Sequence, residues 1–231
     1  DFRRVEAASL KMPTRFTSAE GKRFFARLFN TLQLNAHFIS VIARTRLDHE
    51  DVAKVEEAIR AQMDAVTENL NKAIDGAEAL FKVHGITSTA TYDTVPLDVD
   101  VHVLSSIGRR FLEVLGKLDQ LMPLLQTLEI HEVITTQTVD MQRAGLKRKV
   151  RDVANGARNF AMGLRRRMNA LDAHDVEDRS GPNRQEAEAV GAPDGADEPG
   201  PERDAAVDRT EADASARSPE ALESTVSLVG D

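Results

Sequence analysis

The chain has 231 residues, with 30 Lys and Arg against 38 Asp and Glu and a formal net charge of −8 at pH 7. It contains no cysteine, which excludes a disulfide framework, a thiolate metal site and a cysteine nucleophile. No apolar run is long enough to span a bilayer, and the first residues lack the apolar core of a signal peptide, so we expect a cytoplasmic protein with no membrane partner.

The N-terminal part of the chain predicts a short strand and then a helix. Residues 5–16 include the strand, which Pro13 interrupts. The sequence Thr17-Ser18-Ala19-Glu20 has the spacing of a capping box, in which Thr17 and Glu20 satisfy free backbone N–H groups at a helix start. Apolar residues at helical spacing carry this helix to about residue 46, with a break near Leu34-Asn35.

A longer helix is predicted to begin after Asp48, which can cap it, and to stop at Gly85. Acidic residues line its outer faces. Its apolar residues form one seam, made of Val52, Val55, Ile59, Met63, Val66, Leu70, Ile74, Ala77 and Phe81. A seam of this length packs against neighbouring helices or against a second subunit.

Residues 94–103 change from helical spacing to strict alternation, which predicts a half-buried strand. Pro96 places this strand at the edge of a sheet. Because one strand cannot stand alone, its partner is either the N-terminal segment or the same strand of another subunit. A helix with Ser105 or Ser106 as its cap follows, and Pro123 is expected to kink or divide it.

The strongest chemical pattern lies in a predicted helix over residues 138–171. Its apolar face consists of Leu146, Val150, Val153, Ala157, Phe160, Leu164, Met168 and Leu171. A stripe of cations runs beside that face, at Arg143, Lys147, Arg151, Arg158 and Arg165. Residues 143–168 hold nine Lys or Arg and one acid, so the helix can bury one face and offer phosphates a cationic surface. The alternatives are a solvated face, or a set of ion-pair partners for the acidic helix that starts after Asp48.

Apolar periodicity stops after Asp172, where Gly, Pro, Ala, Asp and Glu dominate. Residues 174–231 hold sixteen acidic and five basic residues, a net charge of −11, and residues 1–173 carry +3. We therefore expect a helical domain with two short strands over 1–173 and a disordered acidic tail over 174–231. The predicted fold class is mainly α, a helical bundle with a short β-ribbon.

Catalytic and cofactor motifs are absent from the sequence. It has no glycine-rich phosphate loop, no dinucleotide fingerprint and no pair of histidines at helical zinc spacing. Asp98, Asp100 and His102 share one face of the predicted strand, where they form either a divalent-cation site or, as we favour, a solvated face. We expect no enzymatic activity, no metal and no cofactor.

The layout of the chain resembles a known family. After the N-terminal strand and the helices, the middle strand contains Val95-Pro96-Leu97, and Gly108-Arg109-Arg110-Phe111, Leu118-Asp119-Gln120-Leu121 and a basic helix follow. Over about residues 5–170 this order is similar to the AcaB-like proteins of conjugative plasmids and integrating conjugative elements. Members of that family are described as transcriptional regulators related to ribbon-helix-helix proteins. The resemblance implies a bacterial, dimeric protein that binds double-stranded DNA.

Proteins of the ribbon-helix-helix class read the major groove with a paired β-ribbon. The polar face of the middle strand offers Asp98 and Asp100, which would repel phosphates. The N-terminal segment, with Lys11 and Arg15, is chemically the better ribbon.

From these patterns we predict a DNA-binding transcription regulator, or an accessory protein, of a mobile element. The predicted contacts to duplex DNA are Lys147, Arg148, Arg151, Arg158, Arg143, Arg109, Arg110, Lys11 and Arg15. The alternative is a helical scaffold protein that binds a protein partner through its apolar seams and does not bind nucleic acid.

We also expect a homodimer, since an edge strand and long apolar seams would gain from a partner surface. Light scattering at micromolar concentration is the measurement that checks this expectation, and a mass of one chain would contradict it.

Overall fold

The computed structural model describes residues 8–180, which form ten consecutive elements. In chain order they are β1 (Leu10–Phe16), α1 (Ala19–Phe24), the π turn η2 (Phe25–Phe29), α2 (Asn30–His37), the π turn η3 (Phe38–Ile42), the 3₁₀ turn η4 (Ala43–Thr45), α3 (His49–His84), β2 (Leu97–Val103), α4 (Ser106–Ile130) and α5 (Thr136–Ser180). The mainly helical class with a two-stranded ribbon is therefore confirmed.

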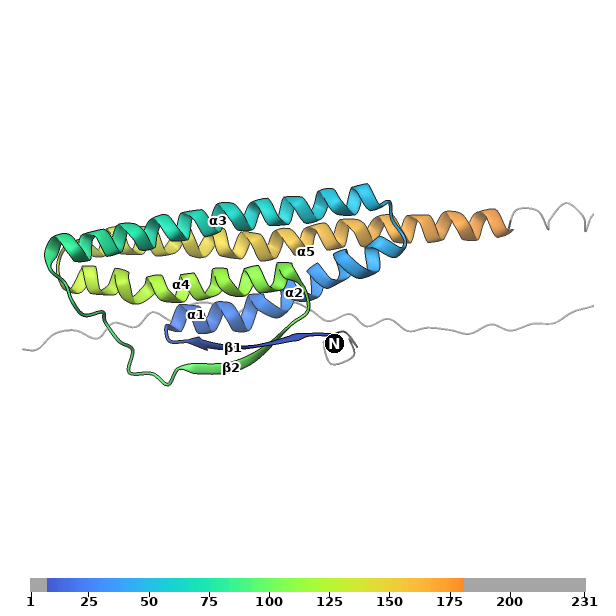
Figure 1. Cartoon of the computed structure of the whole chain (residues 1–231). Helices are drawn as coiled ribbons and strands as arrows, with labels where there is room; N and C mark the ends of the chain where they lie inside the picture. Colours follow the sequence, from blue (N-terminus) through green and yellow to red (C-terminus); the bar gives the residue numbers. More distant parts are fainter. Residues whose placement is uncertain (1–7, 181–231) are drawn as a thin grey trace, which may run out of the picture. The chain divides into compact units, whose positions relative to one another are not determined.

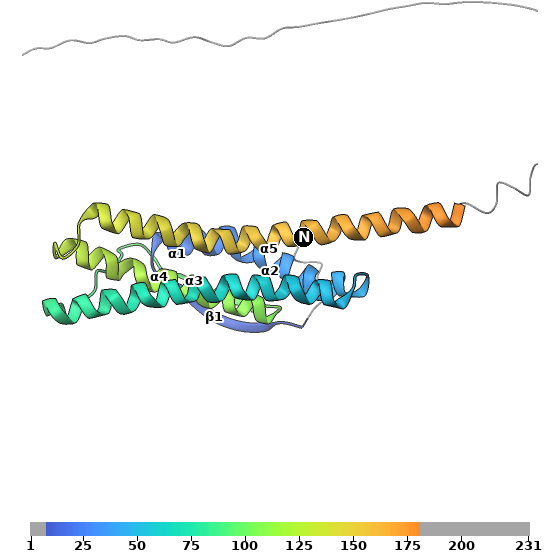
Figure 2. The same cartoon turned by 90° about the horizontal axis from the view of Figure 1, so that it is seen from above.

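Three long helices, α3, α4 and α5, lie side by side, and the helical stretch from α1 to η4 packs along α4 and α5 (Figures 1 and 2). The β1–β2 ribbon contacts α4. None of the helices within residues 8–180 combines the length and apolarity that crossing a membrane requires.

Helix α3 follows its sequence signals closely. Asp48 caps it by accepting a hydrogen bond from the Glu50 backbone N–H at 3.4 Å, and Gly85 ends it with a φ of 63°, a left-handed conformation that suits glycine. Most of the predicted seam is buried, and Val55 and Phe81 are partly buried against the same core. The seam packs on α4 and α5 of its own chain.

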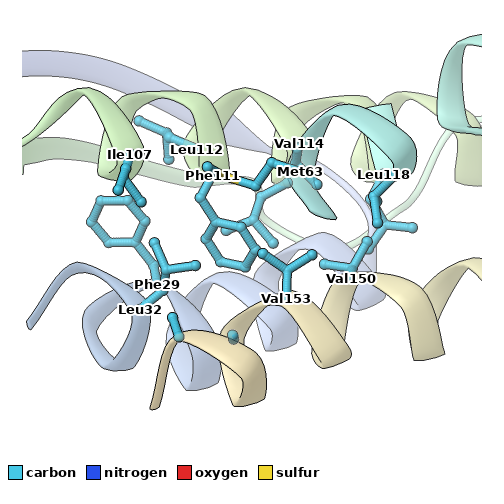
Figure 3. Close-up of a cluster of buried hydrophobic side chains, with 14 of the residues drawn as sticks. Phe29, Leu32, Met63, Ile107, Phe111, Leu112, Val114, Leu118, Val150 and Val153 are labelled. Carbon is cyan, nitrogen blue, oxygen red and sulfur yellow. The ribbon is translucent and has the colours of Figure 1, made fainter. Parts of the chain in front are cut away.

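The core gathers around Phe111 of α4, which is fully buried (Figure 3). Phe29 and Leu32 reach it from the N-terminal helical stretch, Met63 from α3 and Val153 from α5 (Figure 3). All four helical layers thus contribute to one apolar cluster, and burial of this kind stabilises a fold by about 25 cal/mol per Å².

A buried carboxylate fixes the start of α1. Oδ2 of Asp119 accepts hydrogen bonds from the backbone N–H and hydroxyl of Thr17, at 2.9 and 3.1 Å. Oδ1 accepts from the backbone N–H and hydroxyl of Ser18, at 2.8 and 2.6 Å. The Ser18 hydroxyl in turn accepts from the Gly21 N–H at 2.9 Å, so Ser18 is the N-cap. The predicted box with Thr17 as cap is wrong, because the Thr17 side chain is engaged by α4.

Gly21 allows this close approach. A Cβ on Gly21 would lie 2.2 Å from Oδ1 of Asp119, so no larger residue fits without displacing the carboxylate. The contact joins the first turn of α1 to the middle of α4.

The ribbon is antiparallel and forms within one chain, which decides between the two predicted partners of the middle strand. Leu10 pairs with Val103 and Phe16 with Leu97 at its two ends. Gln33 of α2 attaches the end of the ribbon to the helices, because its side chain donates to the His102 carbonyl at 2.9 Å and accepts from the Leu104 N–H at 3.1 Å.

Three expected boundaries differ in the structure. Pro123 lies inside α4 and does not divide it. The helical stretch after β1 has no break at Leu34-Asn35 and instead changes hydrogen-bond pattern in η2 and η3. Helix α5 continues to Ser180, so residues 174–180, which we assigned to the tail, are helical; residues 181–231 of the predicted tail lie outside the described residues.

The apolar seams that motivated the homodimer are used within the chain. Among the residues whose burial the structure describes, the large hydrophobic side chains that stay exposed are scattered over several elements; they are Leu10, Val41, Ile42, Val83, Val95, Ile130, Met141, Met162 and Leu171. The homodimer stays a prediction, and the seams no longer support it.

We predict that Asp119→Ala lowers the free energy of unfolding by about 2–4 kcal/mol, because it leaves the buried donors of Thr17 and Ser18 without an acceptor. Urea unfolding followed by circular dichroism measures this. Asp75→Ala is the matched control, since Asp75 is exposed on α3. Equal stabilities of the two variants would show that the Asp119 contacts do not hold α1.

Candidate nucleic-acid interface

Helix α5 carries a stripe of cations beside its buried apolar face. The helix buries Leu146, Val150, Val153, Ala157, Ala161, Leu164 and Met168. Steps of three and four residues place Lys147, Arg151, Arg158 and Arg165 along one flank of this apolar face. That flank faces the helical stretch from α1 to η3, as the contacts between α5 and α2, η2 and η3 show. Phe160 is half-buried and Leu171 is exposed, in contrast to their predicted place in the seam.

On its other flank α5 meets α3. Nζ of Lys149 donates to the Asn69 side chain at 2.8 Å, and the Arg167 guanidinium pairs with Asp51 at 2.8 Å. Most of the described acids of α3 are paired instead within α3 or with neighbouring helices other than α5. These pairs are Glu50–Lys54, Glu56–Arg44, Glu56–Arg60, Glu57–Arg60, Asp64–Arg110 and Glu68–Lys72. The expectation that α5 serves mainly as ion-pair partner of the acidic helix therefore has little support.

A hollow of about 200 Å³ lies where α1 and η2 face α5. Its lining combines four cations, one carboxylate and two apolar side chains; these are Arg23, Arg27, Lys147, Arg151, Glu20, Phe24 and Leu28. Nζ of Lys147 lies 4.0 Å from Glu20, and the Arg151 guanidinium stands over the Phe24 ring at 6.0 Å from its centroid. The hollow has a local formal charge of +3.

Further along α5 the cationic flank continues. The Arg165 guanidinium stacks over the ring of Phe38, 4.2 Å from its centroid, which restrains the arginine at the surface. Arg148 and Arg166 project from the outermost face of the helix and are exposed. Five exposed arginines of α5 have no carboxylate oxygen within 4.0 Å among the described side chains; they are Arg148, Arg151, Arg158, Arg165 and Arg166.

Arg143 is placed differently from the rest of the predicted stripe. It is half-buried and donates to the Gln126 side chain of α4 at 2.9 Å. Its Nε is buried without a hydrogen-bond partner among the described atoms. Arg143 therefore belongs to the packing between α4 and α5.

The outer face of the ribbon is internally neutralised. Lys11 pairs with Asp100 at 2.8 Å, and Arg15 lies 3.8 Å from Asp98 across the two strands. The two aspartates thus face cations, and no group of His, Asp and Glu side chains suited to a metal ion occurs within the part of the chain that the structure describes. The ribbon presents alternating charges and no net positive surface.

The remaining two predicted contacts are also paired. Arg109 forms a salt bridge with Glu113 one turn later on α4, and Arg110 forms one with Asp64 of α3. The structure therefore brings together the α5 residues of the predicted set, apart from Arg143, and separates them from the four candidates on β1 and α4, which have carboxylate partners.

The sequence pattern did not identify two residues of the basic surface, Arg23 and Arg27. Arg23 and Arg27 lie in a segment whose apolar residues marked it as a core element. Their spacing of four residues, which places both on one face of a helix, is the signal that identifies a second cationic wall.

The three short sequence segments that carry the family resemblance, which contain Val95, Gly108 and Asp119, have structural roles. The Val95 carbonyl accepts a hydrogen bond from Lys22 at 2.7 Å. A Cβ on Gly108 would lie 2.9 Å from the Gln33 side chain, which holds the ribbon. Asp119 holds α1. All three segments contact the N-terminal helical stretch or the residues that directly precede it.

The fold of the chain is similar to that of a solved structure. No protein-family model matches the chain, and no curated protein matches it in sequence. Its structure is similar to the crystal structure of AcaB from uropathogenic E. coli, with a TM-score of 0.68 and 21% sequence identity. The match covers 77% of this chain and 91% of AcaB. The chain therefore has the fold of AcaB, as the layout of its sequence predicted.

Tyr92 offers a spectroscopic probe of the charge on Glu20, which lines the hollow. Burial raises the pKa of its phenol above the ordinary value of 10.0, and the nearby charge of Glu20 raises that pKa further. The neutral phenol is thus favoured in the folded state, so its contribution to stability is present below pH 10 and is lost as the pH rises through the higher folded-state pKa.

We predict that phenolate absorbance, which reports Tyr92 alone because the chain has one tyrosine and no tryptophan, rises at a higher pH in the folded protein than in urea. Glu20→Gln should lower the midpoint. An unchanged midpoint in that variant would separate Tyr92 from the hollow.

Proposed function

We propose that this protein binds double-stranded DNA through the basic surface that α5 forms with α1 and η2, and that it acts as a cytoplasmic transcription regulator or accessory protein of a bacterial mobile element. The observation that carries the proposal is the separation of charges. The four predicted cations on the ribbon and on α4 have carboxylate partners, whereas five exposed arginines of α5 have none among the described side chains.

Unpaired surface cations of this density are suited to a polyanion. Each phosphate that a lysine or arginine neutralises releases condensed counterions, which favours binding at low salt. A carboxylate partner removes that gain, because the cation must first leave its partner. Arg148, Arg151, Arg158 and Arg166 are therefore better candidates for phosphate contacts than Lys11 or Arg109.

The regulatory role rests on the resemblance to AcaB-like proteins, and the shared fold supports it. The neutral outer face of the ribbon argues that α5 supplies most of the affinity. Phosphate contacts of this kind position a protein on the duplex without reading bases directly. A homodimer would present two such surfaces.

A salt series on random duplex DNA tests the proposal against the scaffold alternative. Affinity should fall steeply as salt rises, with a slope of about 0.9 per phosphate contact in a plot of log K against log salt. Absence of duplex binding at low salt would exclude the proposed function and leave a protein–protein role.

We predict that changing Lys147, Arg148 and Arg151 together to Ala weakens binding to every duplex sequence. The salt slope should flatten by about two to three, because the phosphate contacts of Arg148 and Arg151 are lost, together with that of Lys147 where it leaves Glu20. Mobility-shift titrations at several salt concentrations measure both quantities.

The matched control changes Lys54, Lys72 and Lys82 to Ala. It removes the same formal charge from exposed positions on α3, and it should leave the slope nearly unchanged. If both triple variants lose the same affinity and slope, net charge rather than α5 determines binding.

A further inference from the structure

The hollow between α1, η2 and α5 differs from the rest of the basic surface in being concave and two-sided. Arg23 and Arg27 line one wall, and Lys147 and Arg151 line the other. Elsewhere on α5, exposed cations such as Arg148 project from a single helix. Cations that face each other across a recess superpose their potentials on one small volume, and the recess excludes part of the water that would screen them.

We propose that this hollow binds one phosphate group, held between Arg23 and Arg27 on one side and Lys147 and Arg151 on the other. The size of the recess selects the ligand. Pockets for drug-sized molecules measure roughly 300–1,000 Å³, so about 200 Å³ is too small for a whole nucleotide and sufficient for a phosphate. Guanidinium groups match phosphate oxygens with paired hydrogen bonds, which a lysine supplements as a point charge.

The proposal deepens the proposed function, because a backbone phosphate of the duplex is one source of this group and a small phosphorylated molecule is the other. The local backbone is consistent with a binding role. Arg27 belongs to η2, and π turns inside helices occur frequently at functional sites. The Phe24 ring forms part of the lining and restrains Arg151 by stacking.

Glu20 is the internal competitor in this arrangement. Its carboxylate lines the same hollow, 4.0 Å from Nζ of Lys147, and its side chain is only 26% exposed. An incoming phosphate meets the negative charge of Glu20 and competes with it for Lys147. Removal of that charge should therefore strengthen phosphate binding, whereas removal of the arginines should weaken it.

Isothermal titration of the full chain at low salt with sodium pyrophosphate, one phosphate group of which the hollow would hold, is the direct test. We expect Arg23→Ala with Arg27→Ala to weaken binding at least about tenfold, since two charge-assisted contacts are lost. Glu20→Gln should tighten binding several-fold. The matched controls are Lys54→Ala with Lys72→Ala, and Glu78→Gln, which make the same charge changes at exposed positions of α3.

Duplex binding by the same variants identifies the source of the phosphate. If the double arginine variant loses both pyrophosphate and duplex affinity relative to its control, the hollow holds a backbone phosphate. If it loses pyrophosphate alone, the hollow serves a small phosphorylated ligand and stands apart from the DNA surface. If wild-type protein binds pyrophosphate but no duplex, the proposed DNA-binding function is excluded, whereas phosphate binding by the hollow is retained.

The proposal is overturned if the double arginine variant and its control bind both pyrophosphate and duplex equally, or if Glu20→Gln has no more effect than Glu78→Gln. Circular dichroism confirms folding, which the exposure of both arginines favours.

Discussion

The carboxylate of Asp119, buried between α1 and α4, determines where the N-terminal helical stretch lies. It accepts four hydrogen bonds from Thr17 and Ser18, and Gly21 leaves room for it. A buried acceptor with this many donors specifies one position of α1, because any displacement leaves several polar groups unsatisfied in the interior. The position of α1 then sets the positions of Arg23 and Arg27 relative to α5, so a contact within the core builds one wall of the basic hollow.

The distribution of ion pairs has a consequence for function. Cations on β1, α3 and α4 are largely neutralised by nearby carboxylates, at exposed sites where each pair contributes little to stability. Most cations of α5 have no carboxylate partner among the described side chains, so their positive charge is not neutralised locally. A chain whose sequence is acidic as a whole thus carries a local cationic field, and the local field governs encounter with a polyanion.

The two π turns link the fold to that surface. Each turn lets the helical stretch from α1 to η4 stay continuous while it changes which side chains face α5. Near η2 the facing side chains include Arg27 and Phe24, and at η3 they include Phe38, which supports Arg165. A regular α-helix over the same residues would present a different set, and the sequence pattern contains no clear signal for this change.

The sequence by itself determined the features that depend on local chemistry. Periodicity and caps placed α3 between Asp48 and Gly85, alternation placed β2, and the spacing of cations on α5 defined its basic flank. Tertiary structure alone decided which cations remain without a carboxylate partner, because Arg110 meets Asp64 and Lys11 meets Asp100 only after folding. It also decided that the Thr17 hydroxyl donates a hydrogen bond to Asp119 of α4. The packing of α1 and η2 on α5 likewise decided that Arg23 and Arg27 lie opposite Lys147 and Arg151. Pairings between residues far apart in the chain leave no periodic trace in the sequence, since they depend on how whole helices pack.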